Sequence, residues 1–255
     1  MRHQHRYIQR PVMPGERRGV RLLVITPVSP EDGAEGPFPL DSPERSFLLP
    51  TTQVDEILCK GSPVAISGER EVQRVTPLIL AKACWAEASG YDAIVVNCMV
   101  DPGVPELRRT VSIPVIGAGR AAVAVASVLA DRPLSIFPGR IRVNALAEDE
   151  AYTLKELMSI GRRHVATRGA DALTLGCSYL GGAAMRLQDE VGVPVIPTIE
   201  VALKIAELIA CTGIRPQRLG VPNRRARPLT QWVFREKDRL FGLVERLRRR
   251  LRQHS

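Results

Sequence analysis

The chain has 255 residues, of which 45% are hydrophobic and 25% are charged, the balance of an ordinary globular protein with room for one large or two small cores. No apolar run approaches the roughly 20 residues that a membrane-spanning helix needs, so a membrane protein is not expected. Five cysteines, an odd number, argue against a disulfide framework and for reduced thiols. We therefore expect a cytoplasmic protein.

The net charge of +9 is concentrated at the two ends of the chain. Residues 215–255 hold 13 Lys and Arg against 3 Asp and Glu, and residues 1–20 hold 5 against 1. The residues between them hold 18 basic and 23 acidic side chains, so the body of the protein is mildly acidic. Nucleic-acid binding would depend on the Arg-rich tail alone and is not expected, because a solvated or docked terminal helix explains that charge more simply.

Segments with the patterns of strands and helices alternate along the chain, which is typical of parallel βαβ units. In the first half we predict a strand over 21–26, a proline-rich loop over 29–46, a short strand over 45–50, a strand over 62–67, a helix from there to about 90 and a strand over 93–97. In the second half we predict strands over 113–117, 134–137, 172–176 and 193–196, and helices over 120–130, 148–168, 182–191 and 200–212.

The fold class that we predict is α/β, with two flavodoxin-like αβα halves related by a pseudo-twofold axis. The active site is expected between them, where the carboxyl ends of the two sheets face each other. The first half is expected over residues 21–118, completed by part of 200–228, and the second over 119–199. In this scheme residues 1–20 are a basic N-terminal extension and residues 229–255 are an Arg-rich C-terminal helix.

One sequence pattern occurs twice, and each copy carries a cysteine at the same place. The first copy begins GYDAIVVNCMV at Gly90, and the second begins GADALTLGCSY at Gly169. When the copies are laid over each other, Cys98 meets Cys177, and a Pro-Val-Ile triplet follows in both after nearly the same interval. A duplicated unit with a thiol in each copy predicts two thiols that face one another across the pseudo-twofold axis.

Both cysteines are expected directly after a buried strand and before a turn, which is the mouth of a site in α/β folds. A nearby helix N-terminus would lower the pKa of each thiol and populate the thiolate. Two such thiols suit proton transfer at a carbon next to a carbonyl, since one removes the α-proton and the other returns a proton to the opposite face. Backbone N–H groups of the loops over 101–103 and 178–182 would stabilise the enolate, so no cofactor is expected.

Each cysteine also has a simpler interpretation, because cysteine is often a small buried hydrophobe. Taken singly, Cys98 fits an inert core residue as well as a functional one, and only the paired occurrence favours function. Cys59, Cys84 and Cys211 lack that context and are expected to be structural. No CxxC pair or His/Cys cluster occurs in the sequence, so a metal site is not expected.

At these residues the chain resembles the Asp/Glu/hydantoin racemase superfamily, and within it the hydantoin racemases. The similar segments are CMVDPG from Cys98 and LGC ending at Cys177, and the similarity covers about residues 20–210. The resemblance implies a cofactor-independent racemase that uses these two cysteines as acid–base thiols on a hydantoin or amino-acid-like small molecule. A homo-oligomer is expected.

Some positions differ from the family pattern. The family's first strand usually leads into an Asn-Pro-Asn loop, whereas here it leads into TPVSP over 26–30, which offers two hydroxyl groups instead. Family members often carry Glu at the position of Arg120, and hydantoin racemases tend to have an apolar residue at the position of Asn97. The predicted substrate-binding residues, all next to the ends of predicted strands, are Thr26, Ser29, Asn97, Met99, Asp101, Ser178 and Tyr179.

A racemase or epimerase is the function that the pattern favours, and two alternatives stay open. One is a decarboxylase or cis–trans isomerase of the same superfamily; such decarboxylases need only one of the cysteines, which counts against it. The other is a non-catalytic small-molecule-binding protein on the same scaffold. The altered first loop and a stretch between Asp131 and Ala151 that is shorter than usual support this second alternative.

Overall fold

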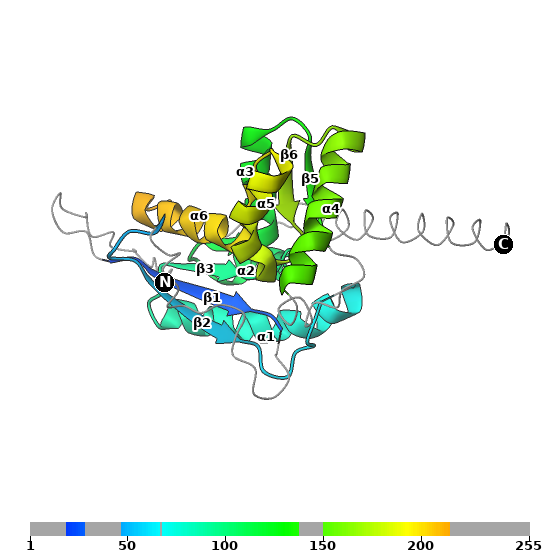
Figure 1. Cartoon of the computed structure of the whole chain (residues 1–255). Coiled ribbons are helices and arrows are strands. Elements are labelled where there is room, and N and C mark those ends of the chain that lie inside the picture. Colours follow the sequence, from blue (N-terminus) through cyan, green and yellow to red (C-terminus); the bar gives the residue numbers. More distant parts are fainter. Residues whose placement is uncertain (1–18, 29–46, 67, 138–149, 215–255) are drawn as a thin grey trace, which may run out of the picture.

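The computed structural model describes residues 19–28, 47–66, 68–137 and 150–214. The expected loop over 29–46, with Ser29, and the expected Arg-rich C-terminal helix lie outside these residues, as does almost all of the N-terminal extension. The described part contains two separate parallel sheets with helices packed around them (Figure 1).

The first sheet has four parallel strands in the order β2-β1-β3-β4. The strands are β1 (Arg21–Thr26), β2 (Gln53–Leu58), β3 (Ala93–Val96) and β4 (Val115–Gly117). The two central strands are nearly continuous runs of Val, Ile, Leu and Ala, and β3 is buried along its whole length. A parallel sheet that is covered on both faces needs this continuous apolar character.

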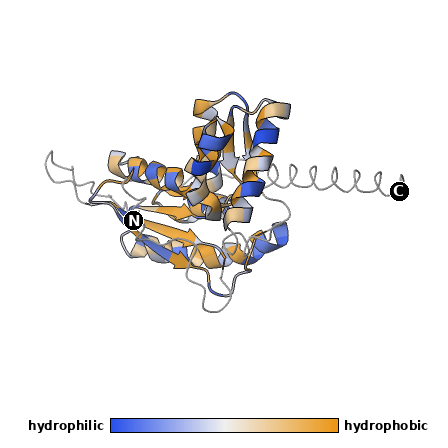
Figure 2. Cartoon of the chain, in the orientation of Figure 1, coloured by the Kyte–Doolittle hydropathy of each residue, from blue (hydrophilic) through white to orange (hydrophobic). Residues whose placement is uncertain are grey.

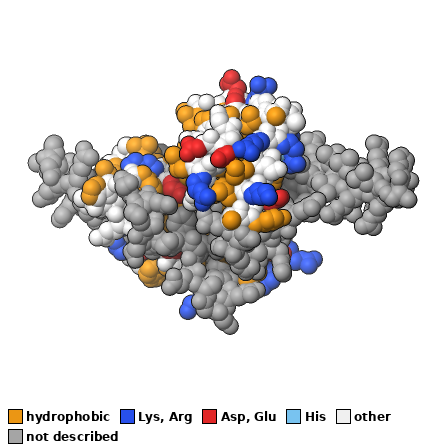
Figure 3. Space-filling view, in the orientation of Figure 1, with side chains coloured by type: hydrophobic (Ala, Val, Ile, Leu, Met, Phe, Trp, Pro, Cys, Tyr) orange, Lys and Arg blue, Asp and Glu red, His pale blue; other side chains and the backbone are white. Residues whose placement is uncertain are grey.

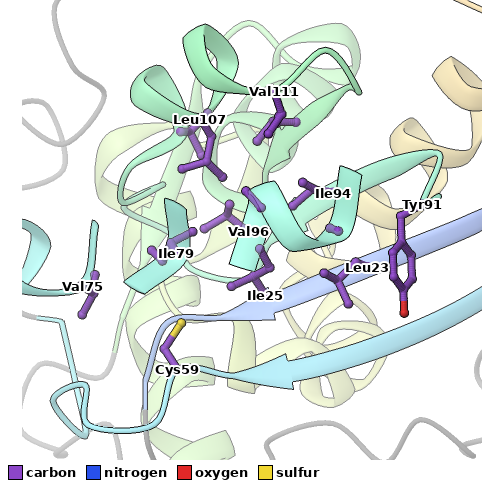
Figure 4. Close-up of a cluster of buried hydrophobic side chains, with 14 residues drawn as sticks. Leu23, Ile25, Cys59, Val75, Ile79, Tyr91, Ile94, Val96, Leu107 and Val111 are labelled. Atoms are coloured by element: carbon purple, nitrogen blue, oxygen red, sulfur yellow. The ribbon is translucent and has the colours of Figure 1, made fainter. Parts of the chain in front are cut away.

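Helices cover both faces of the first sheet. On one face lie α1 (Glu69–Ala88) and α2 (Val104–Thr110), and on the other lie α3 (Ala118–Leu129) and α6 (Thr198–Thr212). Alternate residues of a strand point to opposite faces, so each central strand contributes to two cores. Leu23 packs with the side chains of α1 and α2 (Figure 4), whereas its neighbour Leu22 packs with those of α3 and α6.

The second sheet has three parallel strands in the order β5-β6-β7. Its strands are β5 (Pro133–Ile136), β6 (Ala172–Leu175) and β7 (Val195–Ile196), and its helices are α4 (Glu150–Arg168), the 3-10 helix η3 (Ser178–Ala183) and α5 (Ala184–Val191). Helix α3 contacts strands of this sheet as well as the first one. A small core of Met99, Ala122, Ala126 and Ile196 joins residues of both halves.

The predicted α/β class with two parallel sheets is confirmed, but two strand predictions are wrong. Residues 62–66 form bends and irregular backbone, and residues 47–50 contain no strand. The missed strand is β2, which reads QVDEIL and lies at the edge of the sheet with partly exposed side chains. An edge strand needs no continuous apolar run, and Pro63 lacks the N–H that a ladder requires. The sequence boundaries of the two halves stay predictions.

Hydrophobic residues concentrate on the strands and on the helix surfaces that pack against them (Figure 2). On the face seen in Figure 3, the acidic and basic side chains of the described residues are interspersed. In the described part of the chain, no helix has both the length and the apolar character that crossing a membrane requires.

Candidate active site

The two predicted thiols occupy equivalent positions at the carboxyl ends of the two sheets. Cys98 is separated from β3 by one residue, Asn97, and Cys177 is separated from β6 by one residue, Gly176. Cys177 is buried and Cys98 is partly buried. The charge of Cys177 contributes to a rise in the pKa of Cys98, so the fold brings the two residues close together although they are far apart in the sequence.

The environment of Cys98 acts against the thiolate. Burial is the main cause that raises the pKa of the Cys98 thiol to about 12. A hydrogen bond from the backbone N–H of Val100 lowers the pKa, while the charges of Cys177 and Asp101 raise it further. The prediction of a lowered pKa is therefore wrong for Cys98, because the loss of water around the thiol outweighs the single backbone N–H that stabilises its charge.

Asp101 links the turn after Cys98 to the start of α3 by two hydrogen bonds. One of its carboxylate oxygens accepts a hydrogen bond from the backbone N–H of Gly119 and the other accepts one from Arg120, both at 2.9 Å. Burial raises the pKa of Asp101 to about 6, although these two amides favour the charged form. Both oxygens are thus used within the protein, and contact of Asp101 with substrate stays a prediction.

Two glycines allow this close approach: Gly117 is the last residue of β4, and Gly119 lies in the first turn of α3. A Cβ on Gly119 would lie 2.0 Å from the carbonyl oxygen of Met99, and a Cβ on Gly117 would lie 2.3 Å from the carboxyl carbon of Asp101. Any side chain at either position would collide with the turn that carries Cys98. The Gly-x-Gly spacing is the signal in the sequence that could have revealed this contact.

A chain of three polar side chains crosses the carboxyl end of the first sheet. The hydroxyl of Thr26, the last residue of β1, donates a hydrogen bond to the carboxylate of Glu56 on β2. The side-chain amide of Asn97, directly after β3, donates to the Thr26 hydroxyl at 3.1 Å. Both Thr26 and Asn97 are buried. The sequence pattern predicts Thr26 and Asn97 but not Glu56, whose signal is an acidic side chain within the unpredicted strand β2.

The other predicted binding residues lie close to the two cysteines in the chain but differ in their surroundings. Met99 is buried in the small core that joins the two halves. Ser178 is buried at the start of η3, and Tyr179 follows it there. The structure thus groups Thr26 with Asn97 by a direct contact, whereas roles for Met99, Ser178 and Tyr179 in binding stay predictions.

The remaining cysteines differ from the two thiols of the site. Cys59 is buried at the end of β2, and burial is the main cause that raises its pKa to about 11. Cys84 and Cys211 are exposed on α1 and α6. Among the residues that the structure describes, no group of three or more His, Cys, Asp and Glu side chains is arranged to hold a metal ion.

Comparisons with known proteins point to one family. The sequence model of the family described as Asp/Glu/Hydantoin racemase matches residues 50–137. Hydantoin racemase from Rhizobium meliloti is 32% identical over 185 residues, which cover 62% of this chain and 77% of that protein. Hydantoin racemase from Paenarthrobacter aurescens is 26% identical over 226 residues, covering 78% and 94%. The structure of allantoin racemase from Klebsiella pneumoniae has the same fold, with a TM-score of 0.67 at 20% identity over 82% of this chain and 96% of that one.

Proposed function

This chain belongs to the Asp/Glu/hydantoin racemase family and is an isomerase, and from that premise we propose that it is a cofactor-independent racemase or epimerase whose acid–base groups are Cys98 and Cys177. The observation that carries the proposal is the pair of thiols at equivalent strand ends, close enough for the charge of one to oppose ionisation of the other.

Repulsion between like charges disfavours two thiolates in the pair. Two-base racemisation uses the state with one thiolate and one thiol. The thiolate takes a proton from the carbon next to a carbonyl, and the electron pair of the broken C–H bond moves into the carbonyl to form an enolate. The thiol then delivers its proton to the opposite face of the same carbon. After one turnover the thiolate and the thiol have exchanged roles, so the site is ready for the product enantiomer.

The raised pKa of Cys98 bears on the resting state of the pair. Because burial raises the pKa of Cys98 to about 12, we assign Cys98 as a protonated thiol in the resting pair. In the proposed mechanism the two thiols lie on opposite faces of the reacting carbon, so each enantiomer is deprotonated by a different cysteine.

The proposed substrate is a hydantoin or a related amino-acid derivative. Two relatives named hydantoin racemase and a structural neighbour named allantoin racemase support this choice. Thr26 and Asn97 are the side chains that we expect to contact the substrate beside Cys98, because both are buried at the carboxyl ends of adjacent strands. Asp101 would contribute by holding the loop that carries Cys98.

A cytoplasmic location and a homo-oligomer belong to the same proposal. All five cysteines are free thiols, as a reducing compartment requires. Large apolar side chains are exposed on α3 and α6, among them Val128 at 85% and Leu208 at 59%, and contact with a second copy would bury them.

Exchange of the α-hydrogen with solvent tests the proposal. Single enantiomers of 5-substituted hydantoins and of allantoin are incubated in D2O and followed by proton NMR and polarimetry, against a protein-free sample at the same pH. We expect loss of the α-proton signal together with loss of optical rotation. Cys98→Ala and Cys177→Ala should each abolish racemisation, and each should retain exchange from one enantiomer at most, of opposite hand in the two variants.

Cys211→Ser is the matched control, because it removes an exposed thiol on α6. Racemisation that persists at the wild-type rate in Cys98→Ala or Cys177→Ala would rule out the two-thiol mechanism. Exchange without racemisation in the wild-type protein would point to a one-base reaction instead.

A further inference from the structure

Asn97 carries a buried hydrogen-bond acceptor that the protein does not use. The residue is 4% exposed, and its side-chain oxygen Oδ1 has no hydrogen-bond partner among the described residues. A buried polar atom without a partner costs free energy, and a role in binding or catalysis is one reason for a protein to keep such an atom. A ligand that donates a hydrogen bond at this point would recover that loss.

The orientation of the Asn97 amide follows from its neighbours. The Thr26 hydroxyl has one proton, which it donates to the carboxylate of Glu56. The hydroxyl oxygen therefore accepts from Asn97, whose Nδ2 lies 3.1 Å away. If the amide turned over, two acceptors would face each other, so Glu56 and Thr26 together hold Oδ1 as the free end of the amide.

Asn97 directly precedes Cys98 in the chain, and its backbone is held in place. The backbone N–H of Asn97 donates to the carbonyl of Ile25 at 2.9 Å, and the N–H of Cys98 donates to the carbonyl of Val96 at 3.0 Å. Asn97 is thus anchored to β1 by its backbone as well as by its side chain. In the proposed site, a substrate held at Cys98 would present its substituents to this adjoining residue.

We propose that Asn97 determines substrate specificity, with its Oδ1 accepting a hydrogen bond from an N–H on the atom bonded to the reacting carbon. This inference rests on the proposed function and deepens it. It names the substrate class as amides and ureides that carry such an N–H, and it excludes analogues in which a CH2 group or an N-alkyl group stands in that place. Glu56 is a positioning residue in this arrangement, and Thr26 holds the Asn97 amide in addition to its proposed contact with the substrate.

Two unreactive probes separate recognition from turnover. 5,5-Dimethylhydantoin has the N–H, and 3,3-dimethylsuccinimide has CH2 at the same ring position; neither has a hydrogen on the quaternary carbon for a base to remove. Binding of both is measured by calorimetry to the full-length protein. We expect wild-type protein to prefer the hydantoin on the order of 10-fold, because the succinimide leaves Oδ1 unpaired. Equal affinities, or binding of neither probe, would overturn the inference.

Variants identify the residue responsible. Asn97→Leu keeps the size of the side chain but removes the acceptor, and the preference should fall to within about 2-fold. Thr26→Val frees the amide to turn over and should also reduce the preference, whereas Thr26→Ser keeps the hydroxyl and should retain it. An unchanged preference in both Asn97→Leu and Thr26→Val, with wild-type melting curves, contradicts the inference. If the wild-type protein catalyses exchange of the substrate α-hydrogen but binds both probes equally, the inference about Asn97 is wrong and the proposed function stands. If the wild-type protein catalyses no exchange, the proposed function is wrong.

Discussion

Replacing Gly119 by alanine tests whether close packing of α3 against the Cys98 turn builds the site. The added Cβ would lie 2.0 Å from the carbonyl oxygen of Met99 and 2.7 Å from its carbonyl carbon, whereas ordinary contact begins at 3.4 Å. These are backbone atoms that no rotamer change can move aside, so one of the two chain segments must shift by roughly 1 Å or more. Met99 directly follows Cys98, and the shift therefore displaces the thiol or breaks the hydrogen bonds of Asp101.

The expected cost is large enough to measure in two ways. Overpacking of this kind lowers the free energy of unfolding by about 1–3 kcal/mol, which corresponds to a fall in Tm of roughly 2–12 °C for a domain of this size. A displacement of about 1 Å in a reacting group lowers the rate on the order of 100-fold. Thermal unfolding followed by circular dichroism measures the first effect, and α-hydrogen exchange by NMR measures the second.

Gly182→Ala is the matched control for stability. A Cβ on Gly182 would meet no atom within 4 Å, so its Tm should stay unchanged or rise slightly, since alanine restricts the unfolded chain more than glycine does. If Gly119→Ala has the Tm of the wild-type protein and catalyses α-hydrogen exchange at the wild-type rate, this packing does not position Cys98.

Two further predictions concern titration. Burial raises the pKa of Glu207, but hydrogen bonds led by those from Lys204 and Thr52 outweigh it, so the net shift is downward and the carboxylate stabilises the fold above its usual pKa. Glu207→Gln should cost about 1–3 kcal/mol near neutral pH, with the Tm difference from wild type shrinking as the pH falls through the folded-state pKa; a pH-independent difference contradicts this. Because burial raises the pKa of Cys98 to about 12, iodoacetamide at pH 8 should alkylate Cys98 more slowly than the exposed Cys211, as peptide mass spectrometry would show. Faster reaction at Cys98 would contradict the assignment of Cys98 as the resting thiol.

The sequence predicted those parts of the fold and site that repeat a local pattern. The position of Cys98 and Cys177 after two buried strands could be predicted because each follows an apolar run within one of two matching segments, and a buried parallel strand leaves such a run in the sequence. The edge strand β2 was missed because half-exposed positions carry polar residues. Glu56 was missed with it, so the partner of Thr26 became visible only once β1 and β2 were paired.

Features that depend on contacts distant in sequence escaped prediction. The carboxylate of Asp101 caps α3 across 18 residues of sequence, which no short motif records. The pKa of Cys98 was predicted with the wrong sign, because position after a strand indicates nearby backbone N–H groups but not how completely the surrounding protein excludes water. The local pattern thus placed both cysteines at strand ends, and tertiary packing raised the pKa of Cys98.

The raised pKa of Cys98 is compatible with catalysis by the proposed pair. A thiol that is hard to ionise is scarce as a thiolate, but it holds a proton firmly until an enolate accepts it and is a stronger base once it has given that proton up. The charge of Cys177 opposes ionisation of Cys98, which disfavours two thiolates in the pair. Burial of Cys98 therefore does not abolish acid–base chemistry in this arrangement.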